Sequence, residues 1–341
     1  MNLTNPMPMD PRIAILVPCY NEDAAIDKVV RDFRRSLPAA EVYVYDNNSR
    51  DDTVARACAA GAIVRREERQ GKGNVVRRMF SDIEADVYVL VDGDATYDAP
   101  SAVTMIDMLL HDRLDMVVGV RVHTEAQAYR SGHQFGNALL TGCVTRLFGK
   151  SFTDILSGYR VFSRRFVKSF PALSGGFEIE TELTVHALEL ALPVSELKTP
   201  YGVRPDGSVS KLSTYRDGWR ILRVILGLYR HERPMQFHGM LGAVLVVLSL
   251  LLGIPIVLEF LRTGLVPRLP TALLATAIMG LAALLFTVGL VVETVTRGRR
   301  EMRRLFYLQI PACCWTGNAP ASAAGLAAPL GTHQAQPAQK Q

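Results

Sequence analysis

Two aspartates separated by one glycine, Asp92-Gly93-Asp94, follow the apolar run VYVLV. The glycine lets both carboxylates turn out of the end of a strand together. Two hard oxygen donors with open coordination positions suit Mg²⁺ or Mn²⁺ held jointly by the protein and a diphosphate. An isolated Asp-x-Asp tripeptide is more often a turn than a site, so its importance depends on the residues that lie beside it.

The first two apolar runs of the chain are also followed or ended by residues that could line a site. They are Pro18, Tyr20 and Glu22 after IAILV, and Asp46 at the end of EVYVYD. An acid at the end of a second strand can accept hydrogen bonds from a ribose or a base. The residues from Asn47 to Ser49 equally fit a turn followed by a helix cap near Asp51, and both interpretations can hold together.

A lysine between two glycines, Gly71-Lys72-Gly73, opens a helical pattern after the third apolar run. The segment invites comparison with a phosphate-binding loop, but it lacks the Walker spacing and has no Ser or Thr after the lysine. ATP hydrolysis is therefore disfavoured. We interpret Gly71 and Lys72 as a turn that brings the backbone close to a bound nucleotide, with an ordinary loop as the alternative.

The elements that position these residues follow from the alternation of apolar runs with helical patterns. Strands are predicted at RIAILVP, EVYVYD, AIVRR, DVYVLVD and LDMVVGV, with helices beginning near Asp23, Asp51, Gly73 and Pro100. This alternation predicts an α/β domain with right-handed crossovers and a mostly parallel sheet. Ligands of such sheets bind at the carboxyl ends of the strands, so one edge should collect the polar residues.

The pattern is looser after Arg121. It favours helices over His133–Phe148 and Glu178–Leu190, a strand near Val194–Leu197 and a polar loop from Tyr201 to Leu212.

Two long uncharged runs follow, from Met240 to Leu258 and from Leu269 to Val292. About 20 residues of helix suffice to cross the hydrocarbon of a bilayer. Buried helices of a soluble core are the alternative, but such helices usually keep a polar stripe that these runs lack. The short connection from Glu259 to Arg268 predicts a transmembrane hairpin with both ends on one side.

The flanking charges indicate which side that is. Arginines flank the hairpin at Arg220, Arg223, Arg230 and Arg233 before it and at Arg297, Arg299, Arg300, Arg303 and Arg304 after it. By the positive-inside rule, the large N-terminal part and the C-terminus are expected to be cytoplasmic. The N-terminal residues also lack the basic and then apolar pattern of a signal peptide.

Composition adds further expectations. The net charge of +5 comes largely from residues beside the hairpin, where they would meet anionic lipid, so nucleic acid is not an expected partner. The five cysteines are odd in number and lack Cys-x-x-Cys spacing, which favours reduced thiols.

Trp219–Tyr229 suits a helix in the membrane interface or, alternatively, a core helix. The tail from about Pro311 is predicted to be disordered.

Seven motifs in order, PCYNE, YDNNSRDDT, GKGN, VDGDATY, VVGVR, DILSGYR and the stretch from Arg204 to Lys211, resemble the family 2 glycosyltransferases of the GT-A fold. The resemblance spans about Ile13 to Leu212. Within the family, the sequence is most similar to polyprenyl-phosphate hexosyltransferases, such as dolichyl-phosphate mannose synthases and bacterial undecaprenyl-phosphate sugar transferases. No single motif identifies the family, but seven motifs in this order do form a specific signal.

The resemblance implies roles position by position. The nucleotide sugar would be bound by Pro18, Tyr20, Glu22, Asp46 and Asp92, with Gly71 and Lys72 as further candidates, and the metal, Mg²⁺ or Mn²⁺, by Asp92 and Asp94. The acceptor phosphate or the donor diphosphate would contact Arg121, Arg130, Ser131, Arg204 and Lys211. Asp94, Asp154 and Arg204 would form the reaction centre.

Two positions depart from the family pattern. Asn47 stands where these enzymes commonly carry a second aspartate, which puts the nucleobase contact in question. Thr96 stands where the mannose synthases have a glutamine metal ligand, so that ligand is either absent or replaced by water.

The expected reaction is transfer of a sugar from a nucleotide sugar to a polyprenyl phosphate, by a single displacement with inversion. A lipid phosphate is already an anionic nucleophile, since its second pKa lies near 6 by analogy with phosphorylated side chains. Asp154 is therefore expected to orient the acceptor rather than to act as an essential base. The sequence leaves the sugar open, favours UDP slightly over GDP as the nucleotide, and leaves a homo-oligomer open.

The predicted domains are a catalytic domain over 1–212, a juxtamembrane helix over 213–236, a hairpin over 237–293 with spans at about 238–260 and 269–292, and a basic segment and tail over 294–341. Rival interpretations are a different membrane acceptor, a protein that only binds nucleotide sugars, and a small transporter. A processive polysaccharide synthase, which would share the fold, is disfavoured because its Gln-x-x-Arg-Trp motif is missing from the sequence. A transporter is disfavoured because the spans carry no charge.

Overall fold

The structure, a computed structural model, describes residues 11–123, 142, 152–172, 175–176, 178–203, 227, 230 and 233–312. Apart from residues 142 and 227, the helices predicted over His133–Phe148 and Trp219–Tyr229 lie outside the described residues. So does the predicted tail beyond residue 312.

Within the described residues, seven strands form one sheet of order β3-β2-β1-β4-β6-β5-β7. They are β1 (Ile13–Cys19), β2 (Glu41–Asp46), β3 (Ile63–Arg66), β4 (Val87–Leu90), β5 (Met116–His123), β6 (Arg160–Ser163) and β7 (Val194–Tyr201). β1 pairs in parallel with β2 and β4, β2 with β3, and β5 with β7, whereas β6 is antiparallel to both β4 and β5. The predicted α/β class with a mostly parallel sheet is confirmed. The four-residue β6 was not predicted, because so short a run has no readable periodicity.

The direction of β6 has a consequence for the residues before it. The carboxyl ends of β1, β2, β4, β5 and β7 lie at one edge of the sheet because these strands run the same way. An antiparallel strand begins where its neighbours end, so β6 starts at that edge. The segment that leads into it, Phe152 to Tyr159, is therefore brought to the polar strand ends.

The helices connect the strands. They are α1 (Asp23–Ser36), α2 (Thr53–Ala59), α3 (Lys72–Asp82), α4 (Ser101–His111), α6 (Arg164–Ser169) and α7 (Ile179–Glu189). α1 shows why such segments become helical, since its buried residues Ala25, Ile26, Val29, Val30 and Phe33 follow a helical spacing. The helix starts predicted near Asp23, Gly73 and Pro100 agree closely with the structure.

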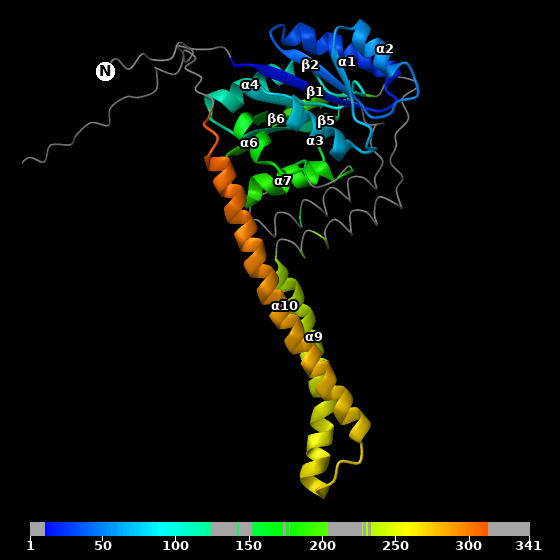
Figure 1. Cartoon of the computed structure of the whole chain (residues 1–341), viewed down its shortest axis with the longest axis vertical. Helices are drawn as coiled ribbons and strands as arrows, with labels where there is room; N and C mark the ends of the chain where they lie inside the picture. The colour runs from blue at the N-terminus through cyan, green and yellow to red at the C-terminus, as the bar shows by residue number, and fades with distance from the viewer. Residues whose placement is uncertain are drawn as a thin grey trace, which may run out of the picture. The chain divides into compact units, whose positions relative to one another are not determined.

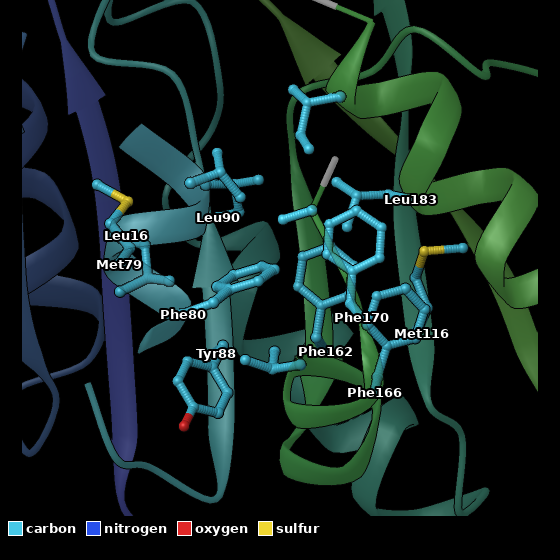
Figure 2. Packing of buried hydrophobic residues seen from close by; sticks show 14 of the residues in the cluster. Leu16, Met79, Phe80, Tyr88, Leu90, Met116, Phe162, Phe166, Phe170 and Leu183 are labelled. Atoms are coloured by element: carbon cyan, nitrogen blue, oxygen red, sulfur yellow. The ribbon is translucent and has the colours of Figure 1, made fainter. Parts of the chain in front are cut away.

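Two apolar layers cover the two faces of the sheet. Successive residues of β1 alternate between them, with Leu16 in one layer and Ile15 and Val17 in the other. The layer that includes Leu16 is rich in aromatic side chains (Figure 2). Phe162 of β6 stacks on Phe166 of α6 with ring centroids 4.7 Å apart, and Phe80 of α3 meets Phe162 edge-on at 5.9 Å. These contacts hold β6 in place and with it the segment that precedes β6.

The last two helices are α9 (Pro234–Thr263) and α10 (Leu269–Leu308), which run side by side (Figure 1). The Ser249 hydroxyl donates to the Ala275 carbonyl at 2.8 Å, and a Cβ at Gly242 would lie only 3.0 Å from the ring of Phe286, a tight contact. Small residues of this kind let apolar helices approach closely. Both helices are long and apolar enough to cross a membrane, and only 17% of each apolar window is buried, unlike the helices of a soluble core.

α10 continues to Leu308, well past Val292, where its apolar run ends. The end of an apolar run is set by hydropathy, but Arg and Glu are good helix formers and let the helix continue. The helix therefore ends later than the apolar run. The polar turns of α10 contact the α/β domain. Arg303 forms an ion pair with Glu189, and Arg300 Nε lies 3.5 Å from the same carboxylate. The Tyr307 hydroxyl donates to Asp115 Oδ2 at 2.8 Å.

Asp115 is fully buried and also accepts hydrogen bonds from Arg165 and Ser163. The Arg165 guanidinium lies 5.1 Å from the centre of the Tyr307 ring. Burial, followed by the hydrogen bond to Asp115, raises the pKa of the Tyr307 hydroxyl above its ordinary value, so it remains a donor at neutral pH. This contact attaches the end of α10 to the domain.

We expect Tyr307→Phe to lower the free energy of unfolding by about 1–2 kcal/mol, because it removes a hydrogen bond to a buried carboxylate. Hydrogen exchange of the last turns of α10 should accelerate at the same time. The matched control is Phe306→Leu, since Phe306 is exposed on the same turn. Equal exchange rates in the two variants would contradict this role for Tyr307.

Candidate active site

The loops that follow β1 and β2 are joined by hydrogen bonds. The Asn21 amide donates to Ser49 Oγ and the Glu22 amide to Thr53 Oγ1, each at 2.9 Å, while Asn21 Oδ1 accepts from the Arg50 amide. Asn21 has a φ of 52°, a left-handed conformation that asparagine tolerates better than most residues. The backbone that carries Pro18, Tyr20 and Glu22 is therefore held against the end of β2.

Asp46 ends β2 and is buried, with its carboxylate accepting from the Ser49 amide at 3.1 Å. The predicted turn after β2 is thus present, and Asp46 is both a turn residue and a residue of the site edge. Asp51 accepts from Thr53 N and Oγ1 at the start of α2, close to the predicted cap.

Asn47 has a structural role that the sequence did not reveal. Its side-chain amide is buried and donates to the carbonyls of Glu67 and Arg69 at 2.8 and 2.9 Å, while its Oδ1 accepts from the Gly71 amide at 2.7 Å. An aspartate could not make the first two bonds, because an ionised carboxylate only accepts. The 67–71 loop, as it is folded here, therefore requires an asparagine at the position where the family pattern has an aspartate.

The same loop has no room for a side chain at Gly71. Gly71 has a φ of 127°, and a Cβ there would collide with the Gly175 carbonyl oxygen. Only glycine adopts this conformation at little cost. Lys72, which follows it, is thereby placed at the start of α3 with its side chain directed toward the end of β4.

Asp92 and Asp94 lie beyond β4, at the same edge of the sheet. Asp94 is buried and accepts from Thr96 Oγ1 at 2.6 Å and from the Thr96 amide at 3.2 Å. Thr96 is therefore a partner of Asp94, a role the sequence analysis did not anticipate. Asp92 Oδ1 accepts from Lys72 Nζ at 2.5 Å, and its other oxygen faces Gly158, where a Cβ would collide with it.

A second carboxylate contacts Lys72. Its ammonium also donates to Glu180 Oε1 of α7 at 2.5 Å, and Glu180 is buried. Burial by itself would lower the pKa of Lys72, but the charges of Asp92 and then Glu180 outweigh it and raise the pKa above its ordinary value. Lys72 is therefore cationic at neutral pH.

Arg121 and Asp154 meet at this edge as a bidentate pair. Arg121 Nε and Nη2, at the end of β5, donate to the two oxygens of Asp154 at 2.7 and 2.8 Å. The Asp154 side chain is 6% exposed and that of Arg121 is 25% exposed, so the guanidinium is the more accessible partner. The sequence analysis assigned them separate roles and did not predict that they pair.

Arg160 holds the segment that carries Asp154. It is fully buried and donates to the carbonyls of Ile155 and Ser157 and to Thr184 Oγ1. Gly158 in this segment donates its amide to the Tyr97 hydroxyl at 3.0 Å. The motif DILSGYR thus contributes Asp154, the glycine that accommodates Asp92 and the arginine that supports both.

The loop after β4 also adjoins the end of β7. The Gly202 amide donates to the Thr96 carbonyl at 2.8 Å, and the rings of Tyr97 and Tyr201 lie 5.1 Å apart at their centres. The chain that leads toward Arg204 therefore leaves from beside the Asp94 loop.

The structure thus brings most of the predicted residues to one edge of the sheet: Pro18, Tyr20, Glu22, Asp46, Gly71, Lys72, Asp92, Asp94, Arg121 and Asp154. Arg130, Ser131, Arg204 and Lys211 lie outside the described residues. Sequence reasoning missed Glu180, Gly158 and Arg160. A charged residue inside the apolar pattern of α7 was the available signal for Glu180.

The donor set agrees with a divalent cation in its chemistry. Asp92 and Asp94 supply hard oxygens, and Gly158 leaves space at the second oxygen of Asp92. Among the described residues, no three His, Cys, Asp or Glu side chains form a group that could hold a metal ion. A cation held by Asp92 and Asp94 would need a diphosphate and water to complete its coordination.

We expect Asn47→Asp to destabilise the protein by about 3 kcal/mol, because a buried carboxylate would then face two carbonyl oxygens. Thermal unfolding and hydrogen exchange of residues 67–71 would measure the loss. Asn48→Asp is the matched control, since Asn48 is only partly buried and its side-chain amide also donates to this loop, at the Glu68 carbonyl. Equal stability of the two variants would show that the Asn47 amide does not hold the loop.

The sequence and fold were compared with known proteins. Residues 14–170 match the family described as Glycosyl transferase family 2. Glycosyltransferase AglJ of Haloferax volcanii is 32% identical over 314 residues, which cover 89% of this chain and 100% of AglJ. The dolichyl-phosphate hexose transferase of the same organism is 26% identical over 221 residues, covering 65% of this chain and 95% of that protein.

Solved structures agree in fold. Glucosyl-3-phosphoglycerate synthase from Mycobacterium tuberculosis, in complex with Mn²⁺, uridine diphosphate and phosphoglyceric acid, aligns with a TM-score of 0.51 and 22% identity. The alignment covers 64% of this chain and 78% of that one. With a parallel-rich sheet, polar strand ends and a relative matched over its whole length, the chain belongs to glycosyl transferase family 2 and is a glycosyltransferase with the GT-A fold.

Proposed function

We propose that the protein transfers a hexose or N-acetylhexosamine, with inversion, from a nucleotide sugar to a polyprenyl phosphate in a membrane. One observation carries the proposal. The sheet edge that gathers Asp92, Asp94 and the Arg121–Asp154 pair belongs to a chain with two exposed apolar helices long enough to span a bilayer. An acceptor held in the same bilayer would account for these helices, which a soluble acceptor does not require.

The nucleotide would lie over the ends of β1 and β2. Asp46 offers an acidic group at the second strand, as in dinucleotide sites, and the segment from Pro18 to Glu22 forms the adjoining wall. Gly71 has no side chain, so a phosphate of the nucleotide could approach the backbone of this turn. UDP is the favoured nucleotide, which agrees with the uridine diphosphate in the mycobacterial structure.

The diphosphate must be stabilised as it leaves. Asp92 and Asp94 would hold Mg²⁺ or Mn²⁺, which supplies charge stabilisation of the diphosphate oxygens. Lys72 adds a positive charge beside Asp92. Arg204 and Lys211 would hold anionic oxygens of the two substrates, since the chain leaves β7 beside the Asp94 loop.

The acceptor needs orientation more than activation. A phosphate monoester is anionic near neutral pH, so no strong base is required. Asp154 holds the Arg121 guanidinium by two parallel hydrogen bonds, and Arg121 would present its accessible side to an anionic oxygen. Arg130 and Ser131 would add contacts to the same phosphate. The arginines on both flanks of the hairpin favour a cytoplasmic catalytic domain with both termini on that side.

The test is a transfer assay with purified protein in detergent, Mn²⁺ or Mg²⁺, a short polyprenyl phosphate and labelled UDP- and GDP-sugars. We expect label from one donor to enter the organic phase only when the metal is present. Folded protein that binds nucleotide but labels no polyprenyl phosphate would refute the acceptor. Transfer to another membrane acceptor in the same assay would replace it.

Asp94→Asn should lower the transfer rate by at least about two orders of magnitude, because it removes charge where the diphosphate departs. Asp107→Asn, an exposed carboxylate on α4, is the charge-matched control and should retain full activity. Retained activity in Asp94→Asn would remove this residue from the reaction.

Gly158→Ala should reduce transfer on the order of tenfold or more, because its Cβ would displace the Asp92 carboxylate. The control is Gly202→Ala, whose Cβ would lie 3.7 Å from its nearest neighbour, the Thr96 carbonyl oxygen. Similar activity in the two variants would mean that the Asp92 position is not limiting.

A further inference from the structure

The Lys72 ammonium lies between carboxylates from two separate elements. Asp92 follows β4 and Glu180 lies in the first turn of α7, and each contacts Lys72 Nζ at 2.5 Å. The Lys72 side chain is 10% exposed and that of Glu180 is 6% exposed, whereas that of Asp92 is 30% exposed. Of the two carboxylates, Asp92 therefore has the freer access to a ligand.

Glu180 has one oxygen that the Lys72 bond does not satisfy. Its Oε2 is buried and has no hydrogen-bond partner among the described residues. Arg160 lies close enough for its positive charge to act on Glu180, but its bonds go to two carbonyls and to Thr184. Buried polar atoms are usually paired, so an unpaired carboxylate oxygen calls for a reason.

Binding of a divalent cation by Asp92 would disturb this arrangement. A carboxylate that turns to a metal ion loses much of its attraction for a nearby ammonium, and the two cations repel each other. Lys72 is too buried to reach water easily, and a buried ammonium without a counter-ion costs several kcal/mol. An ammonium has three N–H donors, so the one released from Asp92 can move to a second acceptor.

We propose that Glu180 is a positioning residue that keeps the Lys72 ammonium in place, through both of its carboxylate oxygens, when Asp92 turns to the divalent cation of the donor complex. The inference rests on the proposed function, because it assumes the cation site at Asp92 and Asp94. Oε2 of Glu180 then accepts the N–H that Asp92 gives up. Glu180 acts through Lys72 and does not itself bind the metal.

The test is a double-mutant cycle that measures Mn²⁺ binding by electron paramagnetic resonance of free Mn²⁺, with full-length protein in detergent and UDP present. The four proteins are the unaltered chain, Glu180→Gln, Lys72→Met and the double variant. We expect Glu180→Gln to weaken Mn²⁺ binding about tenfold, because Lys72 then competes for Asp92 without a second partner. In the Lys72→Met background, the same change should alter binding less than about twofold.

Other outcomes would overturn the inference. Equal weakening in both backgrounds would mean that Glu180 binds the metal directly or acts only through its charge. Unchanged binding in Glu180→Gln would leave Glu180 a purely structural residue. No Mn²⁺ binding by the unaltered protein, even with UDP, would instead refute the metal site of the proposed function.

Two controls support the cycle. Glu182→Gln removes the same charge two positions further along α7 and should leave Mn²⁺ binding unchanged. Lys72→Gln serves as a second neutral variant if Lys72→Met does not fold, and thermal unfolding of every variant shows which proteins enter the comparison.

Discussion

Parallel pairing of β1 with both β2 and β4 determines where the polar residues of the site can lie. The register places Cys19 opposite Asp46 and Leu16 opposite Leu90, so the loops after these strands leave the sheet at one edge. The insertion of antiparallel β6 between β4 and β5 then brings the segment containing Asp154 and Gly158 to that edge. The contacts of the site depend on these pairings, because the strand ends carry nearly all of its side chains.

Buried charged and neutral polar side chains beneath this edge hold its loops in place. Arg160 donates to two carbonyls of the segment before β6, and Asn47 performs the same task for the loop before α3. A buried polar group without a hydrogen-bond partner raises the free energy of the folded state, so each of these side chains favours the one loop conformation that satisfies it. Lys72 differs in that its partners, Asp92 and Glu180, come from separate elements and respond differently to a ligand.

The end of α10 supplies the connection to the apolar helices. Tyr307 meets buried Asp115, and Arg300 and Arg303 meet Glu189 at the end of α7. Glu180 lies in the first turn of α7 and Glu189 is its last residue, so this helix contacts Lys72 near one end and α10 at the other. With the lipid acceptor proposed above, such a contact would fix the height of the site above the bilayer.

The sequence by itself determined the α/β class, the starts of most helices, the two apolar helices and the strand-end residues, because these depend on local periodicity and on residue types next to each other. Its motifs also singled out Asp92, Asp94 and Asp154 as candidate site residues. The tertiary structure decided which of these side chains meet. The pairing of Arg121 with Asp154, of Lys72 with Glu180 and of Tyr307 with Asp115 joins residues 33, 108 and 192 positions apart. Periodicity contains no information on contacts at such separations, which arise only when strand order and helix packing are set.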